Sequence, residues 1–163
     1  AVDGEKIGVM GWSQGGTDAL LAAGQHGEIF KSTVTWAGAP DLSILLSDEL
    51  YEEAKQNGFF VMNFDWREPL NVSLQWCEDV KNVDVLDVFS AYEGPVLAIA
   101  GTMDTTVDPE WSNKIVAANS NPASKTYFIE GMDHTFNVFT EEDHHSLYDA
   151  VDATGAFFAE TLK

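Results

Sequence analysis

The fold is decided by a short stretch near the start of the sequence, Ile7-Gly8-Val9-Met10-Gly11-Trp12-Ser13-Gln14-Gly15-Gly16. It opens with an apolar run of strand length and continues into a glycine-dense turn. Residues 17–25 follow and are rich in Ala and Leu, which favour a helix, and Gly24 and Gly27 mark the end of that helix. The sequence therefore predicts a strand, a tight turn and a helix in direct succession.

The turn carries the pattern Gly-x-Ser-x-Gly at residues 11–15. A sharp turn of this kind holds its serine in a strained backbone conformation, and small flanking residues leave room for it. In an open α/β sheet the hydroxyl then projects from the carboxyl ends of the strands, where such folds build their sites. We expect Ser13 to be a nucleophile and the backbone N–H of Gln14 to be an oxyanion donor. The alternative is a glycine-rich turn with an incidental serine.

A serine hydroxyl needs a base within hydrogen-bond reach, and the sequence has four histidines. His134 comes directly after the last predicted strand, so its loop can reach the nucleophile. His26 follows the first helix at the end remote from the turn. His144 and His145 lie in an acidic helix start, where we expect them to be solvated. We predict that His134 is the base; the alternative is a structural role in its loop.

A carboxylate must hold the imidazole in the right tautomer and stabilise its charged form. Asp104 follows a predicted buried strand and so lies at the carboxyl end of the sheet. Asp108 is its main rival, although Asp108 followed by Pro109 fits a helix start. Asp133 is too close in sequence to His134 to approach its ring from behind. We predict Asp104 as the partner of the base.

Strands and helices alternate along most of the chain, which predicts an α/β fold with a mostly parallel sheet and helices on both faces. Strands are expected at 7–10, 32–37, 95–100 and 125–130, and helices at 17–25, 109–118 and 142–162. Residues 41–92 interrupt this alternation with two helical stretches and no clean strand pattern. They also hold several aromatic residues: Phe59, Phe60, Phe64, Trp66 and Trp76. We interpret this segment as an inserted helical subdomain, because it is too apolar to remain in water.

The order Ser, Asp, His and the segments at 11–16, 101–107 and 131–136 resemble the α/β-hydrolase superfamily. Within it the chain is most similar to bacterial carboxylesterases of the cinnamoyl or feruloyl esterase type, which carry a cap inserted between the corresponding strands. The resemblance implies one partial catalytic domain over residues 1–163, with 41–92 as the cap. It also implies that the amino-terminal strands, and the loop with the second oxyanion donor, are missing from this stretch.

A sheet of only the four predicted strands would leave the strand at 7–10 as an exposed apolar edge, and such edges promote association. We therefore expect either a missing amino-terminal segment or self-association to cover it. Whether this chain alone turns over a substrate is left open by the sequence.

The sequence is strongly acidic, with eight Lys and Arg against 27 Asp and Glu and a formal net charge of −19. Such a surface repels the phosphates of nucleic acids and anionic lipids, so we expect neither as a partner. The acidity is most simply a solvated surface or an adaptation to salt. No apolar run reaches the roughly 18 residues of a membrane span, and residues 1–6 do not resemble a signal peptide, which leaves the location undecided.

The single cysteine, Cys77, cannot form an internal disulfide and has no neighbours at metal-ligand spacing. We expect no metal and no cofactor. The predicted chemistry is a two-step acyl transfer that cleaves a small-molecule ester. The aromatic residues of the insertion favour an aromatic ester if they line a pocket, but they can equally be the insertion's own core. A peptidase or amidase of the same fold, and a non-catalytic fragment or binding module, remain as alternatives.

Overall fold

The chain divides into two compact units in the computed structural model, which describes residues 3–64 and 67–163. The first unit comprises Ala1–Pro40 and Val85–Lys163, and the second comprises Asp41–Asp84. The second unit is shorter than the insertion predicted at 41–92. The difference arises because Val85 and Phe89 pack into the core around Leu20 and so belong to the first unit.

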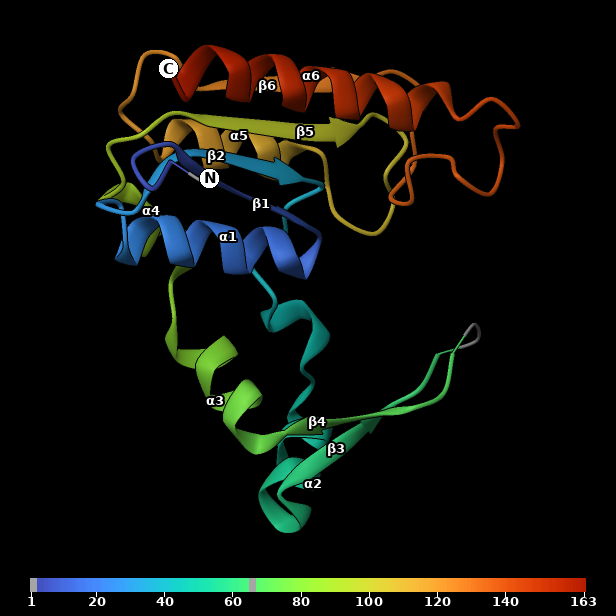
Figure 1. The fold of residues 1–163 in the computed structure, drawn as a ribbon. Coiled ribbons are helices and arrows are strands. Elements are labelled where there is room, and N and C mark those ends of the chain that lie inside the picture. Colours follow the sequence, from blue (N-terminus) through green and yellow to red (C-terminus); the bar gives the residue numbers. More distant parts are fainter. Residues whose placement is uncertain (1–2, 65–66) are drawn as a thin grey trace. The chain divides into compact units, whose positions relative to one another are not determined.

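A four-stranded sheet forms the centre of the first unit, in the order β1-β2-β5-β6 (Figure 1). Its strands are β1 (Ile7–Trp12), β2 (Phe30–Trp36), β5 (Val96–Gly101) and β6 (Lys125–Ile129). All three neighbouring pairs are parallel. The structure thus confirms the α/β class and the parallel sheet predicted from the sequence.

Helices cover both faces of this sheet, as predicted. They are α1 (Gln14–Gln25), α4 (Val85–Ser90), α5 (Glu110–Ala117) and α6 (His145–Thr161). The core is divided into two parts, one on each face of the sheet, and the side chains of the buried strand β5 alternate between them. Val96 and Ala98 join the core formed with α1, α4 and α5, whereas Leu97 and Ile99 join the core under α6.

The strand β1 lies at one edge of the sheet in the described part of the chain. Met10 and Trp12 are 45% and 49% exposed there. Parallel strands all point the same way, so the segments that follow β1, β5 and β6 leave the sheet at one side (Figure 1). These are the three segments that carry the residues singled out in the sequence.

The second unit contains a hairpin that the sequence analysis did not predict. The strands β3 (Phe59–Met62) and β4 (Leu70–Ser73) pair antiparallel, between the helices α2 (Asp48–Asn57) and α3 (Leu74–Asn82). A short 3-10 helix, Ser43–Leu45, precedes them. The strand pattern was missed because Phe59-Phe60-Val61-Met62 is apolar at every position and shows no alternation.

The second unit has its own hydrophobic core, which includes some of the aromatic residues that the sequence left between a pocket and a core. Phe60 and Cys77 are fully buried together with Ala54, and the ring of Trp76 lies 6.2 Å from that of Phe60. Burial raises the pKa of the Cys77 thiol, which favours its uncharged form. Phe60 and Trp76 therefore belong to the unit's own core, whereas Phe59 is 36% exposed and Trp66 lies outside the described residues.

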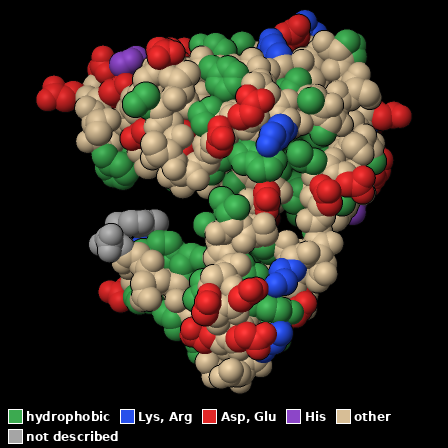
Figure 2. Space-filling model, turned by 180° about the vertical axis from the view of Figure 1, so that it is seen from behind, with side chains coloured by type: hydrophobic (Ala, Val, Ile, Leu, Met, Phe, Trp, Pro, Cys, Tyr) green, Lys and Arg blue, Asp and Glu red, His purple; other side chains and the backbone are tan. Residues whose placement is uncertain are grey.

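Acidic side chains are scattered over the surface of each unit, and Lys and Arg are sparse among them (Figure 2). Within the described residues, no helix is long and apolar enough to cross a membrane.

The core beneath α6 gives a direct test of the packing. Phe157 is 2% exposed in this core, so Phe157→Ala is expected to lower the free energy of unfolding by about 3–5 kcal/mol. Phe139→Ala is the matched control, because Phe139 is 85% exposed and its loss should change stability by less than about 0.5 kcal/mol. Urea denaturation followed by tryptophan fluorescence measures both. Equal stabilities of the two variants would contradict the packing described here.

Candidate active site

Ser13 occupies the turn between β1 and α1 in a backbone conformation that few L-residues adopt. Its φ is 55° and its ψ is −122°. Neighbouring backbone holds it there: the Ser13 N–H donates to the Trp36 carbonyl over 2.9 Å, and the Ser13 carbonyl accepts from Gly16 over 2.9 Å. Such conformations persist only where the surrounding structure enforces them, and they cluster at functional sites.

The glycines around Ser13 do not all serve the same purpose. A Cβ on Gly11 would lie 1.8 Å from the Gly15 carbonyl oxygen, and one on Gly16 would lie 2.8 Å from the Cα of Gly38. A Cβ on Gly15 would meet nothing within 4 Å. The expectation that both glycines of the Gly-x-Ser-x-Gly pattern are sterically required is therefore right for Gly11 and wrong for Gly15. The second close approach falls on Gly16.

The structure brings together the three side chains that the sequence singled out. The Nε2 atom of His134 lies 3.1 Å from the Oγ of Ser13, and its Nδ1 lies 2.8 Å from Oδ2 of Asp104. Ser13 follows β1, Asp104 follows β5 and His134 follows β6. Because a carboxylate can only accept, the arrangement favours the tautomer with its proton on Nδ1, which leaves Nε2 free to accept from the serine hydroxyl.

The carboxylate of Asp104 is fixed through its other oxygen. Its Oδ1 accepts from the backbone N–H groups of Thr106 and Val107 over 2.8 and 2.9 Å, and its side chain is fully buried. The loop after β5 thus turns around this carboxylate and aims its second oxygen at the imidazole of His134. A buried carboxylate held by several donors has little freedom to turn away from the ring.

Both rival carboxylates are engaged in local structure. Asp108 is exposed, and its Oδ1 accepts from the N–H of Glu110 at the start of α5, as a helix cap would. Asp133 accepts from the backbone and hydroxyl of Thr135 and from the backbone of Asn137. Burial by itself raises the pKa of Asp133, but these hydrogen bonds outweigh it and hold the pKa below its ordinary value. Asp133 therefore shapes the loop that presents His134.

Gln14 is exposed and is the first residue of α1, directly after the serine. The first N–H groups of a helix have no partner within it and are available to an anion. Gln14 therefore lies at a helix start, and its role as an oxyanion donor stays a prediction.

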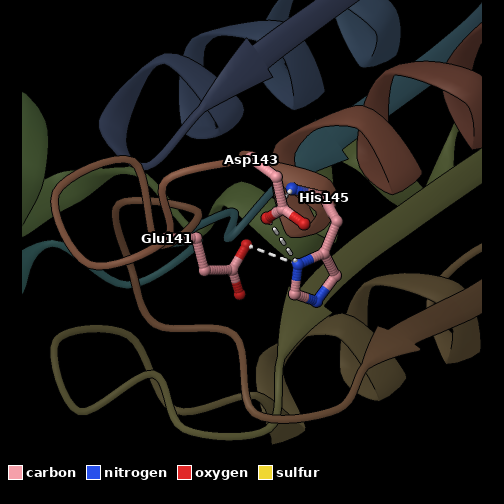
Figure 3. A group of neighbouring side chains, drawn as sticks. All are labelled: Glu141, Asp143 and His145. Atoms are coloured by element: carbon pink, nitrogen blue, oxygen red, sulfur yellow. Dashed lines mark hydrogen bonds and ion pairs between the residues drawn. The ribbon is translucent and has the colours of Figure 1, made fainter.

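A group of possible metal ligands lies at the start of α6, formed by Glu141, Asp143 and His145 (Figure 3). Their ligand atoms lie within 4.8 Å of one another. The Nδ1 atom of His145 is 3.1 Å from a Glu141 oxygen and 3.2 Å from an Asp143 oxygen, so the three groups already satisfy each other. His145 is solvated as expected, whereas His144, which takes a left-handed conformation just before the helix, is half-buried.

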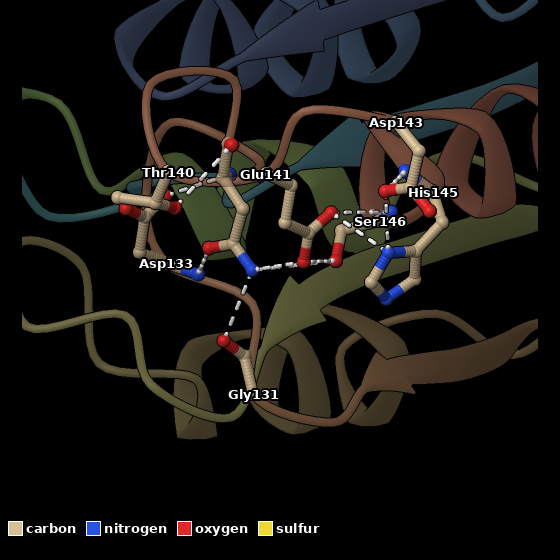
Figure 4. A network of polar contacts seen from close by, with 8 residues as sticks. Gly131, Asp133, Thr140, Glu141, Asp143, His145 and Ser146 are labelled. Carbon is tan, nitrogen blue, oxygen red and sulfur yellow. Dashed lines mark hydrogen bonds and ion pairs between the residues drawn. The ribbon is translucent and has the colours of Figure 1, made fainter.

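The same residues form part of a network of polar contacts that holds the His134 loop (Figure 4). The buried Asn137 makes the central hydrogen bonds of this network. The Asn137 amide nitrogen donates to the carbonyl of Gly131 and to the side chains of Glu141 and Ser146. Its oxygen accepts from the N–H of Asp133 over 2.8 Å. Asn137, which follows His134, thereby ties Gly131 and Asp133, which precede it, to the start of α6.

Asn137 belongs to no catalytic pattern, so nothing in the sequence singled it out as a functional residue. The one available signal was its residue type, since Asn adopts positive φ more readily than most residues, and its φ here is 54°. That signal marks a turn, but it does not reveal the hydrogen bonds to Glu141 and Ser146.

Comparison with known proteins shows the family of the chain. A sequence profile described as the prolyl oligopeptidase family matches residues 1–163. The chain belongs to this family. No curated protein sequence matches it significantly.

Solved structures similar to this family member share the α/β-hydrolase fold. Est1E from Butyrivibrio proteoclasticus is 22% identical with a TM-score of 0.71, over 96% of this chain and 61% of Est1E, and a second Est1E structure holds ferulic acid. The esterase domain of a Rhodothermus marinus protein is 20% identical with a TM-score of 0.64, over 91% of this chain and 59% of that one. A monoacylglycerol lipase from Paleococcus ferrophilus is 16% identical with a TM-score of 0.65, over 90% and 68%.

The chain therefore spans 61% of the length of Est1E and 59% of the Rhodothermus marinus chain. At these identities the likeness shows the fold, which confirms the α/β-hydrolase architecture inferred from the sequence.

The crowding at Gly11 predicts unequal effects of two alanine substitutions in the same turn. Gly11→Ala should lower the free energy of unfolding by about 3 kcal/mol, since the added methyl must displace backbone. Gly15→Ala meets open space within α1 and should be neutral or stabilise by about 0.5–1 kcal/mol. Chemical denaturation measures both, and a destabilised Gly15→Ala variant would overturn this account of the turn.

The lowered pKa of Glu141 predicts that the contribution of the loop network to the stability of the fold depends on pH. Burial alone raises the pKa of Glu141, but hydrogen bonds from Asn137 and Ser146 lower it to about 2. A lowered pKa means that ionised Glu141 stabilises the fold above its ordinary value of 4.5, and this stabilisation is lost as the pH falls from there toward 2. Glu141→Gln should therefore melt below the parent chain at neutral pH, and the gap should close with acid.

The pKa of His145 is raised, first by its hydrogen bond to Asp143 and then by the charges of Glu141 and Asp143. Protonated His145 stabilises the fold below its ordinary pKa, and this stabilisation depends in part on the charge of Glu141. The difference in melting temperature between the parent chain and Glu141→Gln should therefore be larger near about pH 5.5 than near about pH 8. Melting curves across this range measure it. Glu142→Gln removes the same charge at an exposed position and is the control; a similar pH profile for both variants would contradict the network.

Proposed function

We propose that this chain is the catalytic part of a serine hydrolase that cleaves carboxylic esters through an acyl-enzyme on Ser13. The observation that carries the proposal is the hydrogen-bonded line from Asp104 through His134 to Ser13. A nucleophile in contact with a base that a third group orients is the arrangement that activates a serine hydroxyl. Three segments far apart in the sequence have to converge to form it.

The first half of the reaction forms the acyl-enzyme. The Oγ of Ser13 attacks the ester carbonyl carbon while Nε2 of His134 takes the hydroxyl proton. Asp104 stabilises the resulting imidazolium through Nδ1. The backbone N–H of Gln14 donates to the carbonyl oxygen as it becomes negative, and loss of one such donor costs about 3–4 kcal/mol of barrier in other hydrolases. His134 then returns the proton to the departing alkoxide, which leaves as the alcohol.

The second half releases the acid. A water molecule attacks the acyl carbon while Nε2 of His134 takes its proton. The tetrahedral intermediate collapses, the proton passes back to Oγ, and the free serine is restored together with the carboxylic acid.

The solved structures that resemble this chain support an ester as the substrate. Est1E is an esterase with a structure that holds ferulic acid, and two further similar structures are an esterase domain and a monoacylglycerol lipase. We propose an aromatic ester of the cinnamoyl or feruloyl type as the first substrate to test. Hydrolysis of a peptide or amide bond is the second candidate, because the chain belongs to the prolyl oligopeptidase family and the same triad serves both bonds.

The nucleophile is tested by labelling with a fluorophosphonate probe. Ser13→Ala should abolish labelling and lower kcat by roughly a millionfold, as removal of the nucleophile does in other serine hydrolases. Ser120→Ala is the matched control, because Ser120 is exposed and remote in sequence from the turn. Labelling of the Ser13→Ala variant at another residue would refute the assignment.

The bond cleaved is tested by comparing kcat/KM for methyl ferulate, short aliphatic p-nitrophenyl esters and a proline-containing peptide amide. We expect both esters to be cleaved faster than the amide and methyl ferulate to be preferred. Equal rates for the aromatic and aliphatic esters would end the feruloyl hypothesis, and a faster amide reaction would favour the peptidase.

A further inference from the structure

We propose that Trp12 is a positioning residue that sets the distance between the base and the nucleophile. The inference rests on the proposed function of Ser13 and His134. It concerns a side chain that the catalytic pattern leaves unspecified, since Trp12 occupies the first variable position of Gly-x-Ser-x-Gly.

The observation is a pair of contacts between Trp12 and His134, which lie 122 positions apart in the sequence. The indole Nε1–H donates to the backbone carbonyl of His134 over 3.0 Å. The two rings also face each other, with centroids 5.5 Å apart and planes inclined by 37°. One side chain thus contacts both the backbone and the ring of the proposed base.

These contacts control the distance between the His134 backbone and the serine turn, which the other hydrogen bonds of His134 do not fix. Asp104 holds the ring of His134 through Nδ1, and Asn137 holds the backbone that precedes it, at Gly131 and Asp133. The indole instead joins the backbone of His134 to the residue next to Ser13. The contacts therefore form a closed ring of residues. Ser13 contacts the imidazole of His134, the His134 carbonyl contacts the indole of Trp12, and Trp12 directly precedes Ser13 in the chain.

This closed ring of residues matters because proton transfer depends steeply on distance. A displacement of about 1 Å at reacting groups can cost on the order of 100-fold in rate. Trp12 is 49% exposed and lies on the edge strand β1, so its indole contributes little to the core. Its hydrogen bond is therefore better explained by the alignment of His134 with Ser13 than by stability of the fold.

The test uses substitutions that separate the two contacts. Trp12→Phe keeps an aromatic ring and removes the donor, whereas Trp12→His keeps an N–H donor on a smaller ring. Trp111→Phe is the control, because it makes the same chemical change in α5, where the Trp111 ring contacts Lys114. Each variant is measured in the full chain for kcat, KM, the rate of fluorophosphonate labelling and the melting temperature.

Trp12→Phe should lower kcat and the labelling rate together by about tenfold, with KM changed by less than about twofold. Trp12→His should recover most of this loss, and Trp111→Phe should match the parent chain. An unchanged kcat for Trp12→Phe, or a kcat loss that follows a drop in melting temperature, would overturn the inference.

A double-mutant cycle shows whether Trp12 acts through the base. In a His134→Ala background, Trp12→Phe should change the residual rate by less than about twofold, because the group that it positions is gone. A loss as large as in the parent chain would mean that the indole acts on the substrate directly, and would also overturn the inference. Ser13→Ala distinguishes this failure from failure of the proposed function: persistent activity without Ser13 removes the basis for both, whereas its loss leaves only the role of Trp12 in question.

Discussion

The parallel pairing of β1, β2, β5 and β6 is the constraint on which the rest of the structure depends. Parallel strands end on the same side of a sheet, so the segments after β1, β5 and β6 share one edge whatever their separation in the sequence. The turn at Ser13 and the loops of Asp104 and His134 start from that edge. A slip of one residue in β5 would exchange the side chains that pack under α6 with those that pack against α1, α4 and α5.

The sheet brings the loops together, and polar contacts within each loop give them their shape. Backbone N–H groups bind one oxygen of Asp104 and leave the other for the imidazole. Asn137 ties the His134 loop to the start of α6, and the indole of Trp12 ties it to the serine turn. Each of the three reacting groups is therefore supported by neighbours that take no part in the chemistry, which is how a site keeps its geometry.

Several features were predictable from residue type and spacing. Gly11 and Ser13 between an apolar run and a helix-forming run indicated the turn, and His134 and Asp104 each followed a predicted strand. The hairpin of the second unit was missed, because its first strand is apolar throughout and its partner is only four residues long. Gly15 was assigned a steric role that belongs to Gly16, since the close neighbour Gly38 comes from the segment after β2.

The sequence by itself determined the local elements and the identity of the groups that can carry an acyl transfer, because strand, turn and helix preferences and the chemistry of Ser, His and Asp are properties of short segments. The tertiary structure alone decided which carboxylate faces the imidazole, where the second unit ends, and that Trp12 contacts the His134 loop. These depend on contacts between residues tens to more than a hundred positions apart, and such contacts form only when the strands have paired.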